Sequence, residues 1–92
     1  MFKRIESGIS GKSLRLDSLQ WIKNLASSLG LEGAAFTRID GSIRVIAEGE
    51  EVHLVEFIEG LKKAKIFEEE QTFFVNWSKS EKGLGNFYIM SD

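Results

Sequence analysis

The chain has 92 residues, a formal net charge of −2, 42% hydrophobic and 28% charged residues, and neither cysteine nor proline. This composition is typical of one small globular domain, so we expect residues 1–92 to form a single domain around one core. Without cysteine there is no disulfide, thiolate nucleophile or thiolate zinc site, and the lone His53 cannot build a histidine-rich metal site.

The first quarter of the chain predicts a strand and then a helix. Residues 2–9 form a short strand candidate that runs into a polar, glycine-containing stretch. Apolar residues recur at helical spacing over residues 19–29, which predicts a helix. We expect Asp17 or Ser18 to cap its start and Gly30 to end it.

A β-hairpin is predicted next. Residues 34–39 and 42–47 are rich in β-branched and apolar side chains, and they flank the dipeptide Asp40–Gly41. This dipeptide accepts the positive φ angles of a two-residue type I′ turn. The two segments are therefore expected to pair as antiparallel neighbours.

The second half of the chain predicts a helix and two strands. Glutamates at 50 and 51 and lysines at 62, 63 and 65 match the dipole of a helix between them. Its expected apolar stripe is Val52, Val55, Phe57, Ile58 and Leu61. Residues 72–77 have the β-branched and aromatic density of a buried strand, and residues 87–90 form a short last strand.

The predicted order of elements defines a fold class. Strand, helix, strand, strand, helix and strand match the α+β split βαβ arrangement called ferredoxin-like, here followed by a terminal strand. In that arrangement two helices pack on one face of an antiparallel sheet. We therefore expect a βαββαβ sandwich with a short extra strand.

The loop between the first strand and the first helix is the candidate binding site. It contains a glycine, a lysine and an arginine within six residues, which are Ser10, Gly11, Lys12, Ser13, Leu14 and Arg15. Backbone N–H groups of such a loop can form an anion-binding concavity with the cationic side chains nearby. An ordinary solvated turn is an equally good interpretation of these residues alone.

Several short segments of the sequence resemble motifs of the acylphosphatase family. Residues 40–49 (DGSIRVIAEG) and 57–62 (FIEGLK) look like the family's D-G-x-V-x-V-x-A-E-G strand and the helix after it. Residues 26–33 (ASSLGLEG) are similar to its A-x-x-L-G-L-x-G helix end, and residues 85–89 (GNFYI) to its G-x-F-x-I last strand. The resemblance covers nearly the whole chain and implies the fold predicted above.

The resemblance also implies a chemistry, the hydrolysis of small acyl phosphates to carboxylate and phosphate. In that family, N–H groups of the loop after the first strand wrap the phosphate, and an arginine at the end of the loop binds its oxygens. An asparagine at the end of the second strand orients the attacking water. Neither a metal nor a cofactor takes part, since positioning and charge stabilisation do most of the work.

Carried onto this chain, the resemblance makes Arg15 and Thr37 the candidate catalytic residues. The family's G-x-V-Q-G-V-x-F-R pattern fits residues 8–15 loosely and implies Arg15 as the phosphate binder. Counting back from Ala26 instead puts the arginine's place on Leu19, so about four extra residues lengthen either the loop or the helix.

Thr37 is the second departure from the family. Residues 33–41 align without gaps with the family's G-W-V-x-N-x-x-D-G, which places Thr37 where the asparagine is implied. A threonine hydroxyl has a shorter reach than an amide and offers fewer hydrogen-bonding atoms. The implied hydrolysis is therefore expected to be weak or lost, although a threonine is also simply favoured in a strand.

Charge and the remaining residues limit the partners. Residues 1–44 carry seven basic against four acidic groups, and residues 45–92 five against ten, so a small anion is steered to the first half.

The acidic run 68–70 is interpreted as a solvated edge, and we assign no metal. Basic and aromatic residues do not interleave, and no apolar stretch approaches the roughly 20 residues of a membrane span, so we expect neither nucleic acid nor membrane. We expect a cytoplasmic monomer that binds a small acyl phosphate or an inorganic anion.

Three functions remain open at this point. The first is a working acyl phosphate hydrolase, and the second is an impaired relative, a pseudoenzyme, that keeps an anion pocket. The third is a protein-interaction module that uses a sheet edge or an exposed face. The fold alone cannot separate them, because this architecture carries many unrelated functions.

Overall fold

The computed structural model describes residues 1–10, 16–63, 72–80 and 85–90. These residues form seven elements in the following order: β1 (Phe2–Ser10), α1 (Leu16–Ser28), β2 (Glu32–Thr37), β3 (Ile43–Glu50), α2 (Glu51–Lys63), β4 (Thr72–Lys79) and β5 (Phe87–Met90).

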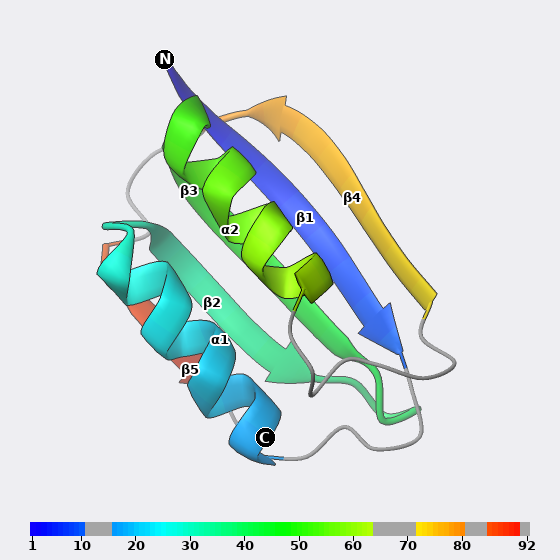
Figure 1. The fold of residues 1–92 in the computed structure, drawn as a ribbon. Helices are drawn as coiled ribbons and strands as arrows, with labels where there is room; N and C mark the ends of the chain where they lie inside the picture. Colours follow the sequence, from blue (N-terminus) through cyan, green and yellow to red (C-terminus); the bar gives the residue numbers. More distant parts are fainter. Residues whose placement is uncertain (11–15, 64–71, 81–84, 91–92) are drawn as a thin grey trace.

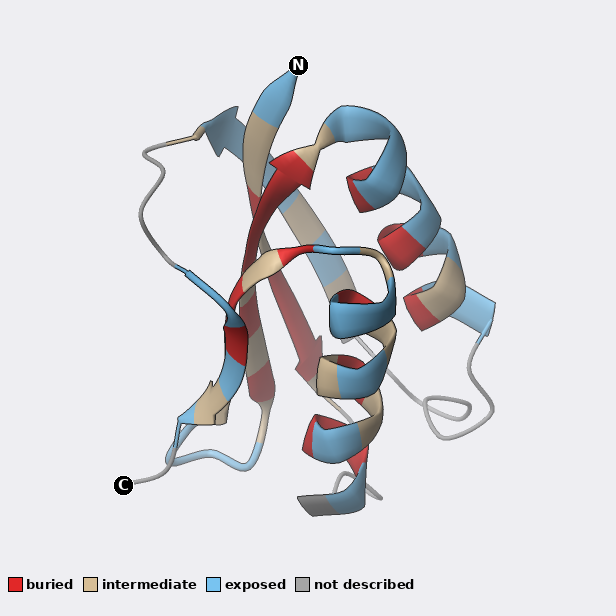
Figure 2. Cartoon of the chain, turned by 90° about the vertical axis from the view of Figure 1, so that its left-hand side faces the viewer, coloured by how far each residue is buried: buried red, intermediate tan, exposed pale blue. Residues whose placement is uncertain are grey.

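The strands form one sheet in the order β4-β1-β3-β2-β5, and both helices cover the same face of it (Figures 1 and 2). β1 is antiparallel to β3 and to β4, and β2 is antiparallel to β3. β5 runs parallel to β2, so the short terminal strand makes the sheet mixed. This confirms the predicted α+β, ferredoxin-like arrangement of two helices on one face.

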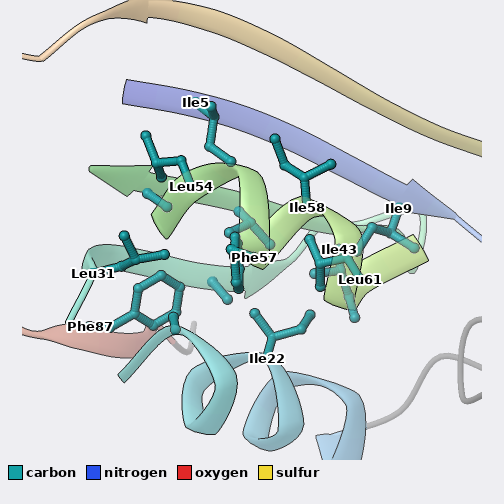
Figure 3. Packing of buried hydrophobic residues seen from close by; sticks show 14 of the residues in the cluster. Ile5, Ile9, Ile22, Leu31, Ile43, Leu54, Phe57, Ile58, Leu61 and Phe87 are labelled. Atoms are coloured by element: carbon teal, nitrogen blue, oxygen red, sulfur yellow. The ribbon is translucent and has the colours of Figure 1, made fainter. Parts of the chain in front are cut away.

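The core lies between the helices and the sheet. Because side chains alternate along a strand, the odd-numbered residues from Ile5 to Ile9 in β1 and from Ile43 to Gly49 in β3 face the helices and are buried. Phe57 of α2 meets Phe87 of β5 edge to face, with ring centroids 6.3 Å apart (Figure 3). The even-numbered residues form the opposite face, which no described element covers (Figure 2).

The buried face of α2 differs from the prediction at three positions, because Leu54 was missed and Val52 and Val55 were wrongly included. The residues that enter the core are Leu54, Phe57, Ile58 and Leu61. Val52 and Val55 are 63% and 45% exposed, so their assignment to the apolar stripe was wrong. Leu54, Phe57, Ile58 and Leu61 follow the i, i+3, i+4, i+7 spacing of one helix face, and each single residue step turns the chain about 100° away from that face.

β4 is an edge strand and is not a buried one. It pairs only with β1 among the described strands, and its Phe74 and Trp77 are 39% and 44% exposed. Phe73 is partly buried and packs against the core from the helix side, as its aromatic density predicted. The prediction failed for Phe74, which alternates to the uncovered face, and for Trp77, which lies opposite Ile5 on the helix side but at the solvent-facing edge of the sheet.

The ends of α1 follow capping geometry. The helix begins at Leu16, so Asp17 and Ser18 lie inside its first turn and are not the cap. Beyond its other end, Leu31 N–H donates to Ala26 O at 3.0 Å, and Gly30 adopts a φ of 71°. This is the left-handed helix end that favours glycine, and it confirms the predicted stop at Gly30.

The β2–β3 hairpin turns through three residues, and the predicted two-residue type I′ turn is wrong. Arg38 N–H donates to Ser42 O at 2.8 Å, and Gly41 N–H donates to Arg38 O at 2.9 Å. Gly41 has a φ of 87°. The hydrogen bonds and this left-handed glycine match the hairpin with a three-residue loop, in which glycine takes the last loop position.

Candidate functional site

The ends of β1 and β2 and the start of α1 lie together at one end of the sheet (Figure 1). Ile9, Ile43 and Thr37 form one row across β1, β3 and β2. Ser10, the last residue of β1, comes one position beyond this row. The fold therefore brings the start of the predicted phosphate loop to the same sheet end as Thr37. The remaining predicted loop residues, 11–15, lie outside the described residues.

Thr37 is exposed at the end of β2. Alternation along the strand puts its side chain on the helix side of the sheet, like that of the buried Ala35. A hollow of about 410 Å³ lies beside it, lined by Phe36 to Asp40. A hydroxyl at this position can hold a water molecule, because it has one donor hydrogen and two acceptor lone pairs.

The alternative place for the phosphate-binding arginine lies inside α1. Counting back from Ala26 reaches Leu19, which lies within α1 and is only 2% exposed. A phosphate-binding arginine would not fit at this core position. Since α1 begins at Leu16, Arg15 comes directly before the helix in the sequence.

The uncovered face carries a cluster at this end that sequence reasoning missed. The Arg44 guanidinium is ion-paired through Nη1 with Glu6 Oε2, and it lies 5.2 Å from the centroid of the Phe74 ring. The ring lies over Gly8, where an added Cβ would come within 2.2 Å of its Cε1 atom. The strand pairing β3-β1-β4 brings these residues together, and only the charge alternation in β1 and β3 gave a local sign of it.

Gly8→Ala is expected to lower the free energy of unfolding by about 1–3 kcal/mol, the usual cost of forcing extra atoms into a packed site. The Phe74 ring must move, and the stacking of Arg44 on it is then lost. Urea unfolding of the variant measures the change. In Gly8→Ala combined with Phe74→Leu the loss should be smaller than the two single losses together, since the clash needs both residues; additive losses would contradict the clash.

Asp40 is fixed within the hairpin. Its Oδ1 accepts hydrogen bonds from the Ser42 backbone N–H at 2.9 Å and from the Ser42 hydroxyl at 2.6 Å. These bonds, with a smaller contribution from the charge of Arg38, hold the pKa of Asp40 below its ordinary value of 3.8. These hydrogen bonds favour the charged form of Asp40, so its carboxylate stays ionised at neutral pH.

Ser42→Ala is expected to raise the pKa of Asp40 towards 3.8, because the hydroxyl is the largest cause of the lowered value. A group with a lowered pKa in the folded state contributes stability above its unfolded value and loses it as the pH falls through the folded value. The hairpin should therefore loosen below about pH 3.8 in the wild type. Titration of the Asp40 carboxyl carbon by NMR measures the shift, and an unchanged pKa in Ser42→Ala would contradict this assignment.

The other residues considered from the sequence add no second site. His53 is exposed in α2, as expected for a solvated histidine. The described residues hold no group of three or more histidine, cysteine or acidic side chains placed to bind a metal ion. The acidic run 68–70 lies outside them. No helix in the described ranges is both long and apolar enough to cross a bilayer.

The fold and the position of the candidate site define a class of protein, the acylphosphatase-like α+β sandwiches. A family model described as Acylphosphatase matches residues 18–89. Since that match covers most of the 92 residues, the chain belongs to the acylphosphatase family. This match confirms the family resemblance that the sequence motifs indicated.

Solved structures agree with this placement. The crystal structure of acylphosphatase from Bacillus subtilis is similar, with a TM-score of 0.86 and 24% identity over 99% of this chain and 100% of that one. An acylphosphatase from Coxiella burnetii has a TM-score of 0.75 and 20% identity over 97% and 93% of the two chains. Full-length HypF in its phosphate- and nucleotide-bound form has a TM-score of 0.80 and 18% identity over 99% of this chain and 12% of its own. These identities show the shared fold alone.

The curated protein sequences contain no match to this chain. The family model therefore shows the family, and the structural neighbours show the shared fold.

Proposed function

We propose that this protein binds small acyl phosphates at the end of the sheet where β1 and β2 finish, and hydrolyses them slowly to carboxylate and phosphate. The proposal rests on the position of Thr37. This residue lies in the same row across the sheet as Ile9, and Ile9 comes one residue before Ser10. The water-orienting position and the start of the phosphate loop thus adjoin the same space. The family's action on acyl phosphates supports this substrate class.

In the proposed mechanism the phosphate is bound by the backbone N–H groups of residues 10–15 and by the Arg15 guanidinium. The fork of N–H donors in a guanidinium matches two phosphate oxygens. A water held at the Thr37 hydroxyl attacks phosphorus in line with the acyl oxygen. The P–O bond to the acyl group breaks, the carboxylate leaves with the electron pair, and the water proton passes to phosphate or solvent.

The slow rate follows from the side chain at position 37. Threonine holds a water through one hydroxyl at short reach, whereas an asparagine amide offers a carbonyl oxygen and an NH₂ group further from the backbone. Less constrained water spends less time in line with the breaking bond, and catalysis depends strongly on that alignment. The threonine at position 37 also supports a second function, the binding of an anion without turnover, because phosphate binding by the loop does not need an aligned water.

The hydrolysis of acetyl phosphate by the purified protein tests the proposal. We expect phosphate release in proportion to protein concentration, above the spontaneous rate, and competitive inhibition by inorganic phosphate. NMR titration with phosphate separates the two functions, because an anion-binding module shifts the amides of the β1 end without releasing product. Absence of both turnover and phosphate-dependent shifts would contradict both functions.

A further inference from the structure

A hollow of about 190 Å³ lies on the uncovered sheet face, at the end that carries the proposed reaction site. The register of the strands explains which residues line this hollow. Arg38 N–H bonds Ser42 O, and Ser42 and Ser10 each come one position beyond the pair Ile9 and Ile43, so Ser10, Ser42 and Arg38 make the last row of the sheet. The hollow has room for several water molecules, each of which takes about 30 Å³ in the liquid.

Two guanidinium groups line this hollow. Arg44 is held in place by its ion pair with Glu6 and by the Phe74 ring beneath it, and its side chain is 22% exposed. Only its Nη1 is used in that pair, so other N–H donors of its fork remain for a ligand. Arg38 is exposed, and within the described part of the chain it has no ion pair.

The negative charges near the hollow are engaged by the protein itself. Asp40 also lines it, and its Oδ1 accepts the two hydrogen bonds from Ser42. Glu6 faces Arg44 across the β1–β3 pair. Arg38 is thus the cation with the most freedom to meet a ligand, and Arg44 is the one that is already oriented. A carboxylate can accept from both, because planar forks of N–H donors match its two oxygens.

We propose that this hollow binds a second anionic group of the substrate, a carboxylate carried by its acyl part. This inference rests on the proposed function, because the hollow adjoins that site at two points. Ser10 is both the last residue of β1 and the first of the proposed phosphate loop, and Arg38 follows Thr37 directly. Thr37 lies on the helix side and Arg38 on the uncovered side, so the substrate passes around the strand ends. The preferred substrates are monoacyl phosphates of dicarboxylic acids.

Binding is tested first, without any need for turnover. Succinate and butyramide, a neutral molecule of similar length, are titrated into the wild type, Arg38→Gln and Lys62→Gln while NMR follows the amides of Arg38 and Ser42. Lys62 is an exposed cation at the end of α2, on the other face of the sheet, so its variant controls for the lost charge. We expect succinate to shift these amides in the wild type and in Lys62→Gln, and to bind Arg38→Gln about tenfold more weakly.

Equal responses to succinate and butyramide, or equal succinate affinities in Arg38→Gln and Lys62→Gln, would overturn the proposal. The second measurement is the ratio of kcat/KM for succinyl phosphate to that for butyryl phosphate. We expect this ratio to be about ten in the wild type and in Lys62→Gln, and to fall to about one in Arg38→Gln. A ratio near one in all three proteins contradicts the second anion site while the proposed hydrolysis stands.

The two proposals fail in different ways. If neither acyl phosphate is hydrolysed but succinate binding depends on Arg38, the proposed hydrolysis is wrong and the anion site in the hollow is supported. If both are hydrolysed and Arg38→Gln changes neither succinate binding nor the ratio, the hydrolysis is supported and the anion site is wrong.

Discussion

Replacement of Arg15 by alanine is expected to lower kcat/KM for acetyl phosphate by about 10²–10³-fold, the usual loss when one preorganised charge-stabilising donor is removed. In the proposed mechanism the guanidinium binds oxygens whose charge is redistributed as the P–O bond breaks, so its interaction is stronger in the transition state than with bound substrate. The loss should therefore appear in kcat as well as in KM. Steady-state assays of phosphate release measure both.

Two controls keep the Arg15 result interpretable. Circular dichroism and urea unfolding of Arg15→Ala should match the wild type if the guanidinium acts on the phosphate alone, since a substitution that removes no packing changes stability by less than about 0.5 kcal/mol. Arg15→Lys should recover only part of the rate, because a lysine keeps the charge and loses the two-pronged hydrogen bonding. Full activity in Arg15→Ala would show that another cation binds the phosphate.

Replacement of Thr37 by asparagine is expected to raise kcat for acetyl phosphate by on the order of 10–100-fold, because small errors in the position of a reacting group cost rates of this size. The longer amide side chain supplies a carbonyl oxygen and N–H donors from the same backbone position, at the end of β2. Thr37 is exposed, so the larger side chain meets no packed wall. The change should appear in kcat, with KM little altered.

Thr37→Val is the matched control, because it keeps the branched shape and removes the hydroxyl. We expect its kcat to fall below that of the wild type if the hydroxyl holds the attacking water. A silent wild type with an active Thr37→Asn would show an intact phosphate loop in a protein that has lost catalysis. Equal rates in the wild type, Thr37→Asn and Thr37→Val would remove position 37 from the mechanism.

The fold was predictable because local signals were consistent along the chain. The periodicity of α1 and the glycine at its end each predicted what the structure contains, including the left-handed Gly30. Asp40–Gly41 located the hairpin correctly and gave the wrong loop length. Two-residue and three-residue hairpin loops favour similar residues, including a glycine with a positive φ. The hydrogen bonds that distinguish the two loops are set by strand register.

Burial was less predictable than secondary structure. Val52 and Leu54 are both apolar residues of one short helix, yet only Leu54 enters the core. Phe73 and Phe74 are neighbours of the same type, and only Phe73 packs against the core. Their positions depend on which side of each element faces the sheet or the helices, and that is a property of the assembled layers.

The candidate site was likewise predictable from the sequence only in part. The sequence by itself determined the family, and it predicts the place of Thr37 in the family's pattern and Arg15 as the phosphate binder, because these depend on residue order and spacing. Only the tertiary structure placed Arg38 and Arg44 around one hollow, although they lie in different parts of the hairpin. Residues 6, 44 and 74 meet because β1 lies between β3 and β4. Such long-range pairing depends on the whole sheet, so the charge alternation in β1 and β3 alone did not predict it.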